Sequence, residues 1–65
     1  MKNKRGYTVK DRIRQDIEYA GGMEKESDRA LLATKALGAA DLAVEFGLIT
    51  YNEWEQFVSM IFEIM

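Results

Sequence analysis

Hydrophobic residues recur at helical spacing along most of the chain. Between residues 27 and 46 they cover an arc of about 260° when the segment is wound at about 100° per residue. Only Thr34, Gly38, Asp41 and Glu45 form a polar strip. A helix that is apolar around most of its circumference needs cover on more than one side. The pattern predicts a central helix over residues 27–46, more buried than its neighbours, with Ser27 as its cap.

Two further helices are predicted on either side of this segment. Residues 8–20 carry a narrow stripe at i, i+4, i+8 and i+11, made of Val9, Ile13, Ile17 and Ala20. Thr8 is suited to cap the start of this helix, because its hydroxyl can accept from a backbone N–H of the first turn. The pair Gly21-Gly22 is expected to end it, since glycine adopts the left-handed backbone conformation without a Cβ clash.

The third helix is expected over residues 51–65. Thr50 and Glu53 fit a capping box at its start, and Gly47 with Leu48 fits a glycine stop at the end of the central helix. Period-two alternation typical of strands is absent from the sequence. The sequence therefore predicts an all-α three-helix bundle, with helices over 8–20, 27–46 and 51–65. The shared core, and with it the candidate interaction residues, is expected at Leu42, Phe46, Trp54, Phe57 and Ile61.

Composition excludes several classes of chemistry. The chain has 65 residues, 48% of them hydrophobic, with no cysteine and no histidine. Nucleophilic systems that use Cys or His, and zinc sites built from these residues, are therefore impossible. Glu24, Glu26 and Asp28 alternate as metal ligands sometimes do, but they lack the spacing and the glycine of a calcium loop. We expect a non-enzymatic protein without a cofactor or a bound metal, and a single domain over residues 8–65.

Charge is polarised along the chain. Residues 1–14 hold six basic residues against one acid, a net +5, whereas residues 15–65 hold three against ten, a net −7; together these give the overall −2. Residues 1–7 are expected to be a flexible basic arm. No apolar run follows the first basic residues, so the sequence predicts no signal peptide and a cytoplasmic location. The third helix is too short for a span of about 20 apolar residues. Its polar side carries Glu where helices that lie on a membrane usually carry Lys and Arg, so no membrane association is expected.

Two function classes follow from these patterns. The wide apolar arcs of the second and third helices exceed what the thin first helix can cover, which favours contact with a second copy or another protein; a complete monomer is the alternative. The other class is nucleic-acid binding, because basic side chains that neutralise phosphates release counterions. Its candidate contacts are Lys2, Lys4, Arg5, Lys10, Arg12 and Arg14.

The segment from Gly47 to Glu55, GLITYNEWE, resembles a turn that recurs in short helical interaction modules, including those of the SHOCT type. In physical terms it is a glycine stop followed by a capping box. The small, acidic, helical character of the chain, without Cys, His or Pro, also resembles accessory proteins of phages and mobile elements in Gram-positive bacteria. The resemblance of the turn implies an interaction role, and neither resemblance assigns a functional residue.

Overall fold

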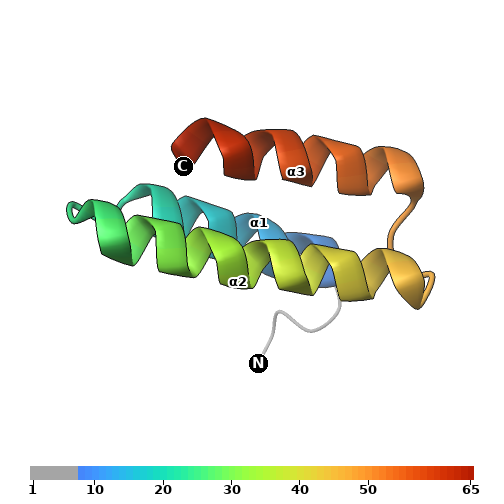
Figure 1. Cartoon of the computed structure of the whole chain (residues 1–65). Helices are drawn as coiled ribbons and strands as arrows, with labels where there is room; N and C mark the ends of the chain where they lie inside the picture. The colour runs from blue at the N-terminus through green and yellow to red at the C-terminus, as the bar shows by residue number, and fades with distance from the viewer. Residues whose placement is uncertain (1–7) are drawn as a thin grey trace, which may run out of the picture.

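The computed structural model describes residues 8–65, which form three helices and no strand. These are α1 (Val9–Gly21), α2 (Glu26–Glu45) and α3 (Tyr51–Ile64). α1 and α2 run antiparallel, and α3 lies along both of them (Figure 1). The all-α three-helix bundle is confirmed, with each boundary within one residue of its prediction. The predicted basic arm at residues 1–7 lies outside the described residues.

Capping boxes start the first and third helices. The Thr8 hydroxyl accepts from the backbone N–H of Asp11 at 3.3 Å, and the Asp11 carboxylate accepts from the backbone N–H of Thr8 at 3.0 Å. Thr50 and Glu53 make the same pair of bonds, at 3.1 and 2.8 Å. Each box satisfies two backbone donors that a helix start leaves without an intrahelical partner.

The start of α2 differs from its prediction. Lys25 occupies the cap position without a side-chain hydrogen bond, and Ser27 lies within the first turn. The predicted Ser27 cap is therefore wrong. Glu26 and Asp28 share that first turn, where the positive end of the helix dipole favours carboxylates. The attraction between these carboxylates and the dipole stabilises a helix start at Glu26, where no side chain caps the helix.

The end of α2 depends on the conformation of Gly47. Its φ of +74° lies in the left-handed region, which side chains disfavour. The backbone N–H of Leu48 then donates to the carbonyl of Ala43 at 2.8 Å, and that of Gly47 to Val44 at 3.2 Å. These two bonds form a Schellman motif. The predicted glycine stop is confirmed, although the Leu48 side chain remains exposed and the buried residue of this turn is Ile49.

The end of α1 uses glycine for a different reason. Gly22 has a φ of −87°, so the predicted left-handed conformation is wrong there. A Cβ added to Gly21 would instead lie 3.3 Å from Cγ2 of Ile64 in α3. The absence of a side chain at Gly21 therefore lets α1 and the end of α3 approach closely.

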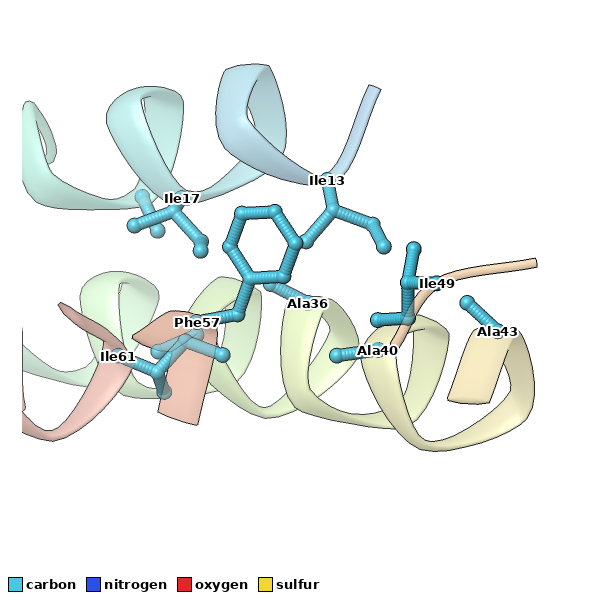
Figure 2. Close-up of a cluster of buried hydrophobic side chains, with 10 residues drawn as sticks. Ile13, Ile17, Ala36, Ala40, Ala43, Ile49, Phe57 and Ile61 are labelled. Atoms are coloured by element: carbon cyan, nitrogen blue, oxygen red, sulfur yellow. The ribbon is translucent and has the colours of Figure 1, made fainter. Parts of the chain in front are cut away.

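A core of buried hydrophobic side chains lies between the three helices, and α2 contributes to it only alanines. Figure 2 shows the ring of Phe57 from α3 near the centre of this cluster, beside Ile13 and Ile17 of α1. Small side chains on α2 allow a close approach of both neighbouring helices. The buried residues are Ile13, Ile17, Ala20, Ala33, Ala36, Ala40, Ala43, Ile49, Phe57 and Ile61.

Two of the five predicted core residues are on the surface. Phe57 and Ile61 are buried as predicted, and Trp54 is partly buried against the core. Leu42 is 55% exposed and Phe46 is 73% exposed, so their assignment to the core is wrong. The reason is geometric, because α1 and α3 both pack on the alanine side of α2 and leave its opposite side in solvent.

Candidate interaction surface

A line of large apolar side chains lies on the side of α2 that faces away from both other helices. Leu31 is 63% exposed and shares this side with Leu42, Phe46 and Gly38, and with Lys35 at the edge nearer α1. These five residues are spaced at i, i+4, i+7, i+11 and i+15, which places them on one helical face. We call this set the outer face of α2. Its midpoint is open, since a Cβ built on Gly38 would have no atom within 4 Å.

A shallow groove of about 340 Å³ adjoins the outer face. Its lining residues are Asp41, Val44 and Glu45 of α2 and Tyr51 and Trp54 of α3, and we call it the acidic–aromatic groove. The indole Nε1 of Trp54 donates to Oδ1 of Asp41 at 2.6 Å. The rings of Tyr51 and Trp54 lie with centroids 5.2 Å apart and planes inclined by 31°. The groove thus presents two aromatic rings and two carboxylates to the same open space.

The carboxylate of Glu53, at the same end of the bundle, already has a cationic partner. Nζ of Lys10 lies 2.9 Å from Oε2 of Glu53, which ties the start of α1 to the start of α3. The backbone N–H of Thr50 and then the Lys10 ammonium lower the pKa of Glu53 below its ordinary value. Within residues 8–65, Asp41 and Glu45 have no such cation: Asp41 accepts only the neutral indole N–H, and Glu45 makes no ion pair.

A second, smaller groove of about 210 Å³ lies between α1 and α2. Arg12, Asp16, Tyr19, Leu32 and Lys35 line it, and Nε of Arg12 lies 3.3 Å from Oδ1 of Asp16. This groove therefore contains two cationic side chains and one carboxylate. Both grooves are at or below the lower end of the ~300–1,000 Å³ typical of small-molecule sites.

The predicted interaction residues do not share one surface. Leu42 and Phe46 lie on the outer face of α2 and Trp54 lines the acidic–aromatic groove, whereas Phe57 and Ile61 are in the core and cannot reach a partner. Sequence reasoning placed Gly38 in the polar strip, but it missed Leu31 and Lys35 as members of the exposed face. The signal was the alanine stripe at 33, 36, 40 and 43, whose opposite side is centred on Gly38.

The candidate nucleic-acid contacts fall into two groups. Lys2, Lys4 and Arg5 lie outside the described residues. The other three form ion pairs within the bundle: Lys10 with Glu53, Arg12 with Asp16, and Arg14 with Asp11 at 3.3 Å. Arg14 also lies 6.0 Å from the ring centroid of Phe57. These three candidate contacts are therefore already engaged in intramolecular ion pairs.

Residues 8–65 lack the features of a metal site and of a membrane-spanning helix. No group of three or more acidic side chains there is arranged to hold a metal ion. None of the three helices combines the length and apolar character that crossing a bilayer requires.

Comparisons with known proteins found no relatives. No protein-family model matches the chain, and comparison with curated proteins and with solved structures gave no significant match.

Proposed function

We propose that the protein is a small, non-enzymatic interaction module that associates with a second copy of itself through the outer face of α2. The observation that supports this proposal is the exposure of Leu31, Leu42 and Phe46 on one helical face. Large apolar side chains exposed on one helical face are typical of contact surfaces, because their burial against a partner removes apolar area from water.

The midpoint of the outer face favours a helical partner. Gly38 leaves open space between Leu31 and Leu42, and helix axes approach more closely where the contact residues are small. An isologous contact uses the same surface patch on both copies, so one exposed stripe is sufficient for a dimer.

Sedimentation velocity from micromolar to near-millimolar concentration tests this proposal. We expect the full chain to shift from monomer to dimer as its concentration rises. Phe46→Ser should weaken the dimer, whereas Phe62→Ser is the matched control, because Phe62 is similarly exposed on α3 and lies off the outer face of α2. Both variants should keep the helical circular dichroism of the unmodified chain. A strict monomer over the whole range would refute self-association.

A further inference from the structure

The acidic–aromatic groove offers four groups that attract a cation, and none of them has a cationic partner within residues 8–65. The carboxylates of Asp41 and Glu45 have no cationic partner within residues 8–65. Tyr51 is 63% exposed, and its ring lies beside that of Trp54 at the same groove. Aromatic faces attract cations, Trp most strongly, and carboxylates bind guanidinium and ammonium groups by charge-assisted hydrogen bonds.

The geometry points to a specific ligand class: we propose that this groove binds an arginine or lysine side chain carried by a basic segment of a partner polypeptide. The occupant follows from charge complementarity. Lys10, which pairs with Glu53 at the same end of the bundle, is already engaged at 2.9 Å. The two groove carboxylates are therefore left for a cation supplied from outside the bundle.

The hydrogen bond from Trp54 to Asp41 prepares the groove for such a ligand. The 2.6 Å contact joins the edge of the indole to one carboxylate oxygen, Oδ1. It therefore fixes the carboxylate and the ring relative to each other without neutralising the carboxylate. A carboxylate has two oxygens and about four acceptor positions, so Asp41 retains capacity for a guanidinium.

Apolar contacts extend the groove onto the outer face of α2. Glu45 lies three residues after Leu42, and Phe46 four residues after it, so the three side chains are neighbours on the helix surface. A bound segment with apolar residues beside its basic residue would therefore cover Leu42 and Phe46 as well. This inference concerns a separate site and does not depend on self-association of the chain.

The single tryptophan of the chain lies in the groove and reports binding directly. The probe is the peptide acetyl-Ala-Arg-Ala-Arg-Ala-amide, titrated into the full chain while Trp54 fluorescence is recorded. The control peptide carries citrulline in place of arginine, which keeps the shape of the side chain and removes its charge. We expect a saturable fluorescence change with the arginine peptide, weakened by added salt, and no saturable change with the citrulline peptide.

Asp41→Asn is the sharpest variant, because the Asn carbonyl oxygen can still accept from the Trp54 indole. Its removal of one charge should weaken binding of the arginine peptide about tenfold, and Glu45→Gln should act similarly. Glu55→Gln, on α3 and outside the groove lining, is the control and should bind as the unmodified chain does. Helical circular dichroism checks that each variant is folded.

Each remaining outcome overturns the proposal. Equal response to the arginine and citrulline peptides would mean that charge does not drive binding. Unchanged affinity in Asp41→Asn and Glu45→Gln would place the peptide elsewhere. A salt-dependent Trp54 signal in the chain alone, with no response to the peptide, would mean that basic residues of this chain already occupy the groove.

Discussion

Two glycines provide a test of how backbone conformation alone sets stability. A Cβ built on either Gly38 or Gly47 would have no atom within 4 Å, so alanine at either position gains no contact and creates no clash. Gly38 lies in the interior of α2 with a helical backbone, whereas Gly47 has a φ of +74°. Gly38→Ala should therefore raise the free energy of unfolding by about 1 kcal/mol, and Gly47→Ala should lower it by about 1–2 kcal/mol.

In a domain of this size 1 kcal/mol corresponds to a change of roughly 4–8 °C in Tm. Thermal and urea unfolding followed by far-UV circular dichroism would measure both variants. The protein should be kept at the lowest workable concentration, because Gly38 lies on the outer face of α2 and association would add to the measured stability. The reasoning is refuted if both variants shift Tm in the same direction, or if Gly38→Ala leaves it unchanged.

Other substitutions test the core, the caps and the titration of Glu53. Phe57→Ala should cost about 3–5 kcal/mol in urea unfolding, because its ring is buried among all three helices; Trp54→Ala should cost less, since its side chain is only partly buried against the core, and equal losses would contradict the assigned burial. Thr50→Ala should cost about 1 kcal/mol in urea unfolding by loss of the capping box, and amides that exchange only through global unfolding should lose protection by the same free energy. The pKa of Glu53 is lowered on folding, so its carboxylate stabilises the fold at pH values above its ordinary, unfolded pKa, and this stabilisation is lost as the pH falls through the lowered pKa. The difference in unfolding free energy between the unmodified chain and Glu53→Gln should shrink over that acidic range, whereas Glu55→Gln should show no such change.

Helix positions could be predicted because they depend on local interactions. Two capping boxes and one glycine stop are formed by residues only a few positions apart, at Thr8, Thr50 and Gly47. Each of them could therefore be recognised in the sequence. The start of α2 lacks a side-chain cap, so its signal was weaker and Ser27 was misplaced. Gly21 shows the limit of such reasoning, because its close contact with Ile64 comes from the other end of the chain.

The buried side of α2 could not be predicted from hydrophobicity, because apolar residues cover most of the circumference of that helix. Its alanines and its large residues at Leu31, Leu42 and Phe46 occupy opposite sides, and a hydrophobicity pattern scores both as apolar. Side-chain size distinguishes them. Two helices that pack on the same side of a third approach most closely over small residues such as Ala36 and Ala40, so the alanine stripe becomes the core.

The side chains of α2 that form the core and those that remain exposed to solvent lie on opposite sides of the helix. The core is complete without Leu42 and Phe46, whose side chains contribute little burial to the monomer while exposing apolar area to water. Substituting either residue by a polar one should therefore change the free energy of unfolding little. The same substitution removes apolar area from the surface that we propose as the contact. Stability and association thus depend on opposite sides of one helix, and a variant on the outer face can alter association while the bundle stays folded.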